Sequence, residues 1–282
     1  MSDNRVLVYK KAGQTPLEAI SEAKNTYPEW RHLPVTYAGR LDPLAEGALL
    51  LLAGDECLKK DEYLALPKEY ELSILFGFAT DTYDLMGKIV YISKDNSFLG
   101  HGYFSAEKFL VFAPSRSQVT KKELSFEKTD FDKVAELFTG RIKQAYPAYS
   151  SRTVNGKPLY QWAREGRLAE ITIPIHEVFV ESIDFLEQSE ISGEDLQKKI
   201  HDDISRVNGD FRQEEIVALW DNILNDYKDT VFSVVKLRIR CGSGVYVRAL
   251  ANDIGKTIGI PALALKIVRT KIGEYDISLL QE

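Results

Sequence analysis

The chain of 282 residues is poor in the residues that build metal and disulfide sites. Its two cysteines, Cys57 and Cys241, give neither a disulfide framework nor a metal-binding pattern, which favours a reducing compartment. The four histidines have no ligand-like spacing. No apolar run approaches the roughly 18 residues that a transmembrane helix needs, and the first residues lack the blocks of a signal peptide. We therefore expect a cytoplasmic protein with no bound metal and no membrane segment.

The chain has no excess of positive charge, because it contains 36 basic and 42 acidic residues and its net charge is -6. The acidic excess is local: residues 181–230 carry a net -9, and the rest of the chain carries +3. A nucleic acid needs local positive charge rather than a basic chain, so pairs such as Lys10 with Lys11 could serve it. Each such pair by itself is typical of a solvated face. We expect the acidic stretch of residues 187–228 to be a helical, peripheral insertion, either a solvated face or a protein-binding surface.

The spacing of apolar residues predicts an α+β fold with a mixed, mainly antiparallel sheet flanked by helices. Thr15 and Pro16 are the residue types of a helix N-cap and first turn. Alternation is clearest in residues 70–76, which we expect to form a hairpin with residues 88–93, and in residues 230–240. Further strands are expected over residues 6–11, 48–53, 171–186 and 271–277, helices over 131–139 and 246–258, and an irregular segment over 94–128.

The most informative segment, residues 36–54, reads TYAGRLDPLAEGALLLLAG. Pro43 disfavours helical geometry in the residue before it, so Asp42 is expected in an extended loop just before a buried strand. A lone carboxylate held on a stiff turn against the core is a suitable mount for a nucleophile or a general base. An Asp-Pro pair also starts many ordinary turns, so this segment alone leaves both readings open.

Several segments together resemble one family. GRLDPLAEG, at residues 39–47, looks like the active-site motif of the TruB-type pseudouridine synthases. The other similar segments are KKAGQT at 10–15, KEYELSILFGFATDTYDLMGKIV at 68–90, QAYPAYSSRTVNGKPLYQWAREG at 144–166, CGSGVYVRALANDIG at 241–255 and LKIVRTKIG at 265–273. Each is a weak signal, but their shared order is specific. Two segments, near residues 94–128 and 187–228, do not share the resemblance and are interpreted as insertions.

The resemblance implies an enzyme that isomerises a uridine in RNA. Such enzymes break the N-glycosidic bond, turn the base and rejoin it through C5, with one aspartate and without metal or cofactor. Carried over, Asp42 is the catalytic carboxylate, Arg248 pairs with it, and Tyr70 stacks on the base. The nucleotide must be flipped out of its helix before its base can be turned, and a flipped base needs an aromatic stacking partner.

The resemblance also implies the substrate and its contacts. The expected RNA is the T-arm stem-loop of tRNA, with the uridine at position 55 as target and the protein acting as a monomer. Residues 129–170 resemble the family's RNA-clamping thumb, inserted into a single catalytic domain of residues 1–282, and no C-terminal PUA domain is expected. The candidates for substrate contact are Tyr37, which replaces a usual histidine, Arg40, Tyr246, Arg152, Lys157, Arg164 and Arg269.

Three alternatives remain. The same chemistry could act on another RNA, because the GRLD pattern is also similar to the RluA and RsuA branches of the superfamily. The fold could serve a non-catalytic RNA-binding or RNA-folding protein. Asp42 and Glu46 could be the carboxylate pair of a glycosidase. In the TDTYD loop, Asp81 and Asp84 favour turn capping over a magnesium site.

Overall fold

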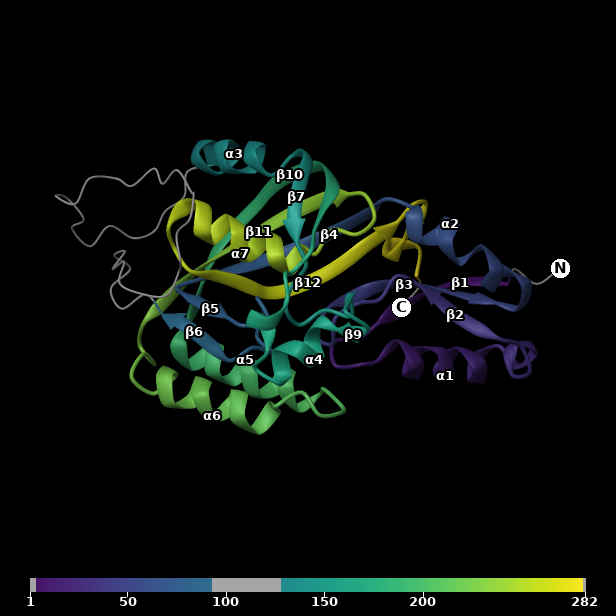
Figure 1. The fold of residues 1–282 in the computed structure, drawn as a ribbon, viewed down its shortest axis with the longest axis horizontal. Coiled ribbons are helices and arrows are strands. Elements are labelled where there is room, and N and C mark those ends of the chain that lie inside the picture. The colour runs from purple at the N-terminus through teal and green to yellow at the C-terminus, as the bar shows by residue number, and fades with distance from the viewer. Residues whose placement is uncertain (1–3, 93–127, 281–282) are drawn as a thin grey trace.

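The computed structural model describes residues 4–92 and 128–280. Its centre is a nine-stranded sheet with the order β1-β3-β12-β4-β11-β10-β7, to which β2 adds beside β3 and β13 beside β12 (Figure 1). β3 and β12 run parallel, and the other described pairs of this sheet run antiparallel. The predicted α+β class with a mixed, mainly antiparallel sheet is therefore confirmed.

The elements have the following bounds. The strands of the main sheet are β1 Arg5–Lys10, β2 Val35–Ala38, β3 Glu46–Ala53, β4 Lys68–Phe76, β7 Gly140–Ala145, β10 Ile175–Ser192, β11 Val231–Cys241, β12 Ala262–Ile272 and β13 Tyr275–Asp276. Two small sheets consist of β5 Phe78–Thr80 with β6 Ile89–Ile92 and of β8 Thr153–Val154 with β9 Lys157–Pro158. The α-helices are α1 Pro16–Thr26, α2 Lys60–Ala65, α3 Lys128–Leu137, α4 Leu159–Arg164, α5 Gly193–Ser205, α6 Gln213–Leu224 and α7 Val247–Ile258, and the 3-10 helices are η1 Pro28–Trp30, η2 Gly54–Lys59, η3 Leu168–Glu170 and η4 Ile277–Leu279.

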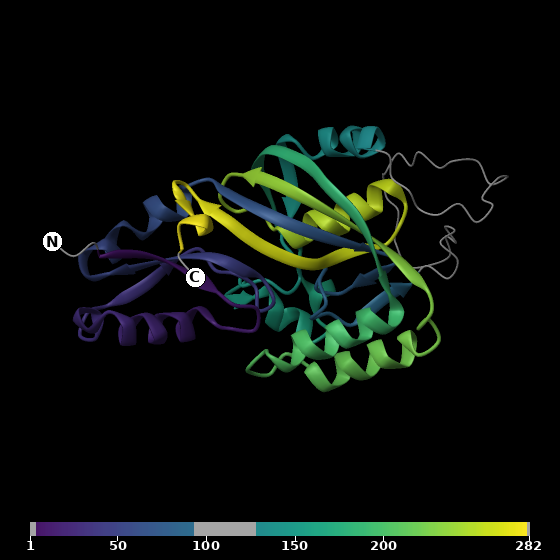
Figure 2. The same ribbon diagram turned by 180° about the vertical axis from the view of Figure 1, so that it is seen from behind.

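The central strands supply two hydrophobic cores, one on each face of the sheet. On one face, Leu72 of β4 and Leu237 of β11 pack with residues of α7 and α3. On the other face, Leu75 of β4 and Val234 of β11 pack with residues of α5 and α6, the helix pair seen below the sheet in Figure 2. Successive side chains of a strand point to opposite faces, so the same strands serve both cores. With much of both faces covered, the loops at the ends of the elements are the main places left for a functional site.

The acidic stretch of residues 187–228 contains the predicted helices, α5 and α6, but their position differs from the prediction. β10 continues to Ser192, whose hydroxyl then caps α5 by accepting a hydrogen bond from the Asp195 amide at 3.0 Å. One apolar face of each helix is buried, and its residues are Leu196, Ile200, Ile204, Ile216, Trp220 and Leu224. The expectation of a peripheral element is wrong, because a four-residue spacing turns these side chains to the sheet while most acidic side chains stay outside.

Two strand predictions also need correction. The predicted hairpin of residues 70–76 with residues 88–93 is not formed over its described part, residues 88–92; β6 pairs with β5, because Gly77 has a φ of +106° and ends β4. The sequence pattern predicts a strand only from Lys271, whereas β12 begins nine residues earlier and runs through the middle of the sheet. Two register shifts against β4 interrupt its alternation and hide the two-residue period.

The predicted helices agree with the structure to within a few residues. α1 begins with a capping box at Thr15, and α7 ends at Ile258 as predicted. α3 begins at Lys128, three residues before its predicted start. The rest of the predicted irregular segment, residues 94–127, lies outside the described residues. No helix in the described ranges is both long and apolar enough to cross a membrane.

Replacing Trp220 by alanine tests whether α6 belongs to the core. The indole is fully buried and its ring lies 5.1 Å from that of Phe78, so Trp220→Ala should lower the free energy of unfolding by about 3–5 kcal/mol in chemical denaturation. Glu214→Ala, at an exposed position of the same helix, is the control and should change it by about 0.5 kcal/mol or less. A loss below about 1 kcal/mol for Trp220→Ala would mean that the helix is peripheral after all.

Candidate active site

A pocket of about 910 Å³ opens where segments from distant parts of the chain meet. They are the loop between β2 and β3, the turn between β5 and β6, the segment after β7 and the start of α7, and the connection between α5 and α6 closes a further side. Arg152 and Lys157 are not among the lining residues. The other predicted site residues all line the pocket, namely Tyr37, Arg40, Asp42, Tyr70, Arg164, Tyr246, Arg248 and Arg269.

Asp42 and Arg248 form an ion pair in this pocket. Arg248 Nε donates to Asp42 Oδ2 at 2.8 Å. Arg248 Nη1 donates to the carbonyl of Thr82 at 2.7 Å, and Nη2 donates to the carbonyl of Tyr149 at 2.9 Å. The arginine side chain is 3% exposed and the aspartate 33%, so a buried guanidinium holds a carboxylate that solvent can reach. Burial alone lowers the pKa of Arg248, but the carboxylates of Asp42 and Asp84 raise it, so the arginine stays charged.

Tyr70 of β4 lies across from Arg269 of β12 in the sheet and lines the same pocket as Asp42. Burial raises the pKa of the Tyr70 phenol, although the positive charge of Arg269 acts in the opposite direction. The phenol therefore stays neutral, and Tyr70 supplies an aromatic surface among the residues that line the pocket. That is the surface on which a nucleotide base can stack.

Arg269 is placed differently from its prediction as a substrate-contacting residue. Its side chain is only 1% exposed; Nε donates to the carbonyl of Ala48 at 2.7 Å, and Nη2 donates to the carbonyl of Gly39 at 3.1 Å. These two carbonyls lie on either side of Asp42 in the chain, so Arg269 ties together both ends of its loop. Because no exposed face is left for a phosphate, we assign Arg269 to positioning this loop.

A buried lysine binds the same loop. Lys10 of β1 is 0% exposed, and its Nζ donates to the carbonyls of Asp42 at 3.3 Å, Pro43 at 3.1 Å and Ala45 at 2.6 Å. Burial lowers the pKa of Lys10 from 10.5 to about 8, although the carboxylates of Asp42 and Glu46 favour its charged form. The sequence suggested a basic pair on the surface, and nothing in that pattern distinguishes Lys10 from exposed Lys11.

Asp84 adds a second carboxylate close to Arg248. Its Oδ1 accepts hydrogen bonds from the Met86 amide at 3.0 Å and from the Thr82 hydroxyl, which is the turn capping that the sequence predicts. Burial raises the pKa of Asp84 from 3.8 to about 6; the Arg248 charge opposes this shift and the Asp42 charge adds to it. Within the described residues, no group of three or more His, Cys, Asp or Glu side chains is arranged to hold a metal ion.

Tyr146, His176 and Tyr246 form an aromatic wall of the pocket. The rings of Tyr146 and His176 stack with centroids 4.0 Å apart, and Tyr246 meets Tyr146 edge-on at 5.8 Å. Gln144 fixes Tyr246, because its side chain accepts from the Tyr246 amide at 2.8 Å and donates to the Tyr246 carbonyl at 3.1 Å. An isolated histidine carries no positional signal, so the sequence did not indicate His176.

Tyr37, Arg40 and Arg152, which are predicted to contact RNA, are partly or fully exposed. Arg40 Nη2 lies 3.4 Å from the hydroxyl of Tyr37, which places a cation beside an aromatic ring at the pocket. The Arg152 guanidinium lies 5.0 Å over the ring of Tyr146, next to the aromatic wall. Cations beside aromatic rings suit a nucleic acid, which presents phosphates and bases together.

Arg164 and Lys157 are engaged within the protein. Arg164 pairs with Asp210 of the α5–α6 connection, and Lys157 pairs with Glu165 at 2.7 Å. Both pairs are partly exposed, and such pairs contribute little to stability, so a phosphate can compete for either cation.

The predicted thumb, residues 129–170, is partly built into the main body. Phe131 of α3 is buried in a core of the sheet, and β7 pairs with β10. The residues between 146 and 170 carry the aromatic and basic side chains described above. That residues 129–170 act as an RNA-binding thumb stays a prediction.

Glu46, the possible second carboxylate of a glycosidase, is not among the residues that line the pocket. Its side chain pairs with Lys266 at 2.7 Å. A glycosidase needs two carboxyl groups on either side of one bond. Asp42 and Glu46 do not provide that arrangement.

Comparison with known proteins gives a consistent result. Residues 31–101 and 114–209 match the family model described as "TruB family pseudouridylate synthase (N terminal domain)". The "tRNA pseudouridine synthase B" of Carboxydothermus hydrogenoformans is 28% identical over 285 residues, which cover 99% of this chain and 74% of that protein. The protein of the same name from Ligilactobacillus salivarius is 25% identical over 277 residues, covering 98% of this chain and 70% of the other.

A solved structure supports the fold. The chain is similar to one in the structure titled "Crystal Structure of a Cbf5-Nop10-Gar1 Complex", with a TM-score of 0.50 and 15% sequence identity. The match covers 96% of this chain and 50% of that chain, so this chain spans half the length of its solved neighbour. At this identity the likeness concerns the fold alone.

The raised pKa of Asp84 predicts how stability depends on pH. Between pH 3.8 and about 6 the folded chain keeps a proton that the unfolded chain has lost, so the free energy of unfolding falls as pH rises through this range. Asp84→Asn removes the titrating group and with it this decrease in the free energy of unfolding. The free energy of unfolding of the variant minus that of the protein without substitutions should therefore rise by roughly 1–3 kcal/mol from pH 4 to pH 7. Denaturation at both pH values measures the difference. Asp202→Asn, at an exposed position, is the control, and equal pH dependence in both variants would contradict the prediction.

Proposed function

The chain belongs to the TruB family of pseudouridylate synthases, and from this we propose that it is a tRNA pseudouridine synthase that modifies the T-arm uridine at position 55 with Asp42 as its catalytic carboxylate. The observation that carries the proposal is the Asp42 carboxylate itself, one-third exposed to a 910 Å³ pocket and held at 2.8 Å by buried Arg248. The relatives named tRNA pseudouridine synthase B support tRNA as the substrate.

The reaction is an isomerisation and needs no redox partner. The bond between N1 of uracil and C1′ of the ribose breaks, and a bond between C5 and C1′ forms. C5 loses its proton and N1 gains one, so the atoms balance. We assign the contact with the nucleotide to Asp42, whose carboxylate Arg248 orients by a charge-assisted hydrogen bond. A carboxylate so held can act as a nucleophile or as a base.

The pocket suits a nucleotide that has left its helix. A target base inside an RNA helix is out of reach of Asp42, so it has to be flipped out. Tyr70 offers the flipped base an aromatic face, and Tyr246 and Tyr146 offer further aromatic surface for its neighbours. Arg152, over the Tyr146 ring, and Arg40, beside the Tyr37 hydroxyl, are exposed and can contact phosphates.

Asp42→Ala tests the catalytic role. The unchanged protein should release tritium from C5-labelled uridine in a T-arm transcript, and Asp42→Ala should release it only at the uncatalysed background rate because no other group takes over its role. RNA affinity, measured by filter binding, should stay within about 3-fold, since phosphate contacts dominate binding. Asp55→Asn, at an exposed carboxylate of η2, is the control and should keep full activity.

The outcomes separate the parts of the proposal. If the unchanged protein binds the T-arm transcript but releases no tritium, and pseudouridine mapping of total RNA finds no other product, the chain is a binding protein. If it modifies another RNA, the chemistry stands and the T-arm substrate is wrong.

Lys10→Met tests how closely the Asp42 loop must be held. Without the ammonium, the carbonyls of Asp42, Pro43 and Ala45 lose a shared donor, and a shift of the loop by about 1 Å costs up to about 100-fold in rate. We expect the single-turnover rate constant to fall by about 10- to 100-fold with little change in RNA affinity. Lys11→Met removes an exposed lysine next to it and should keep the rate. Equal rates for the two variants would show that Lys10 does not position Asp42.

A further inference from the structure

The connection between α5 and α6 belongs to the pocket, although it lies in a stretch to which the sequence assigns no part in the site. The resemblance excludes residues 187–228, and the family-model match ends at residue 209. The side chains of this connection that line the pocket are Val207, Asn208, Asp210, Phe211 and Arg212. The helix pair therefore contributes to the site as well as to the core.

Arg212 makes the most extensive contacts of this connection. Its Nη1 donates to Asp81 Oδ2 at 2.7 Å and to the hydroxyl of Tyr149 at 2.8 Å, and its Nη2 donates to Asp81 Oδ1 at 3.2 Å. The guanidinium carbon also lies 4.3 Å from the centre of the Tyr149 ring. This two-point grip on a carboxylate, combined with stacking, is a geometry that arginine provides and lysine does not.

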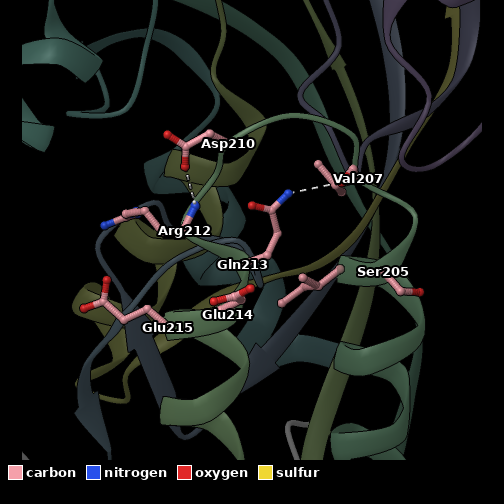
Figure 3. A pocket seen from close by; sticks show the side chains of 8 residues that line it. Ser205, Val207, Asp210, Arg212, Gln213, Glu214 and Glu215 are labelled. Atoms are coloured by element: carbon pink, nitrogen blue, oxygen red, sulfur yellow. Dashed lines mark hydrogen bonds between the residues drawn. The ribbon is translucent and has the colours of Figure 1, made fainter.

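The backbone of Arg212 is in an unusual conformation. Its φ is +65°, in the left-handed region that a long side chain rarely occupies. Figure 3 shows this part of the chain from close by: the Gln213 amide turns toward Val207, to whose carbonyl it donates at 3.1 Å, and Arg212 points away from it. The conformation costs about 1–3 kcal/mol, so the contacts with Asp81 and Tyr149 have to stabilise it.

The two residues that Arg212 binds are the ones next to the acceptors of Arg248. Tyr149 accepts from Arg212 through its hydroxyl and from Arg248 through its carbonyl. Asp81 binds Arg212, and the following residue, Thr82, accepts from Arg248 through its carbonyl. Arg212 and Arg248, from different parts of the fold, therefore both form hydrogen bonds with the segment at residues 81–82 and with Tyr149.

We propose that Arg212 is a positioning residue for the pseudouridine synthase reaction: it holds the segments around Asp81 and Tyr149 so that their carbonyls keep Arg248, and through it Asp42, in place. This inference rests on the proposed function and adds to it a role for the helix pair. A second contact supports it, because Glu215 of α6 pairs with Lys88 at the other end of the turn that contains Asp81. Arg164 and Asp210 link the same connection to α4.

Arg212→Gln is the first test. The single-turnover rate constant on the T-arm transcript at saturating enzyme should fall by about 10-fold or more, because the orientation of the reacting carboxylate is loosened. RNA affinity should stay within about 2-fold, and Arg212→Lys should restore part of the rate, since its ammonium keeps one contact to Asp81. Arg206→Gln, at the exposed first residue of the connection and outside the pocket lining, is the matched control and should keep the rate. A rate for Arg212→Gln equal to that of the control would overturn the proposal.

A double-mutant cycle separates positioning from general destabilisation. If Arg212 acts through the Tyr149 hydroxyl, Arg212→Gln combined with Tyr149→Phe should be no slower than Arg212→Gln alone. If the two effects on the rate constant multiply, the residues act independently and the proposal fails.

Hydrogen exchange tests the same point without any reaction. The amides of residues 80–84 and 149–151 should exchange faster in Arg212→Gln than in Arg206→Gln, because both segments lose a shared anchor. Unchanged exchange in both segments would refute the positioning role, whether or not the protein modifies the T-arm. If exchange is faster in Arg212→Gln but the protein without substitutions modifies no RNA, the positioning role stands and only the proposed function is contradicted.

Discussion

A guanidinium that is 3% exposed is costly in a protein interior unless its donors meet acceptors, and Arg248 meets three from separate segments. One is the carboxylate of Asp42, and the others are the carbonyls of Thr82 and Tyr149. If any of the three segments moves away, a buried charge loses a partner. The rest of the architecture can be understood as the means by which these segments are kept together.

Buried cations that bind backbone carbonyls are the main device. Lys10 binds the carbonyls of the Asp42 loop, and Arg269 binds the carbonyls at its two ends. Arg212 differs in that it binds side chains: it contacts the other two segments at the Asp81 carboxylate and the Tyr149 hydroxyl. A loop held by its backbone leaves its side chain free, which is why the Asp42 carboxylate can be both fixed and accessible. The acidic helix pair supplies Arg212 while burying its apolar face against the sheet.

Much of the fold could be predicted because local patterns agree with it. The alternation in β4 and β11, the capping box at Thr15 and the Gly-rich turn before α7 all appear in the sequence. The predictions of secondary structure were wrong where the spacing of apolar residues was interrupted or was obscured by charged residues. Register shifts in β12 hid its alternation, a glycine after β4 redirected the next pairing, and acidic residues masked the apolar spacing of α5 and α6.

The sequence by itself contained the motifs in their order along the chain. Those motifs were enough to indicate the family and to predict that Arg248 pairs with Asp42. It could not show that Lys10 and Arg269 are buried, that Asp84 lies close to Arg248, or that Arg212 reaches Asp81 and Tyr149. Those contacts join residues that are far apart in the chain. The sequence gives the same residue type whether a charged side chain is exposed to water or bound to a carbonyl. Burial and the direction of a side chain are set by the packing of the whole sheet and its helices, so only the tertiary structure decided them.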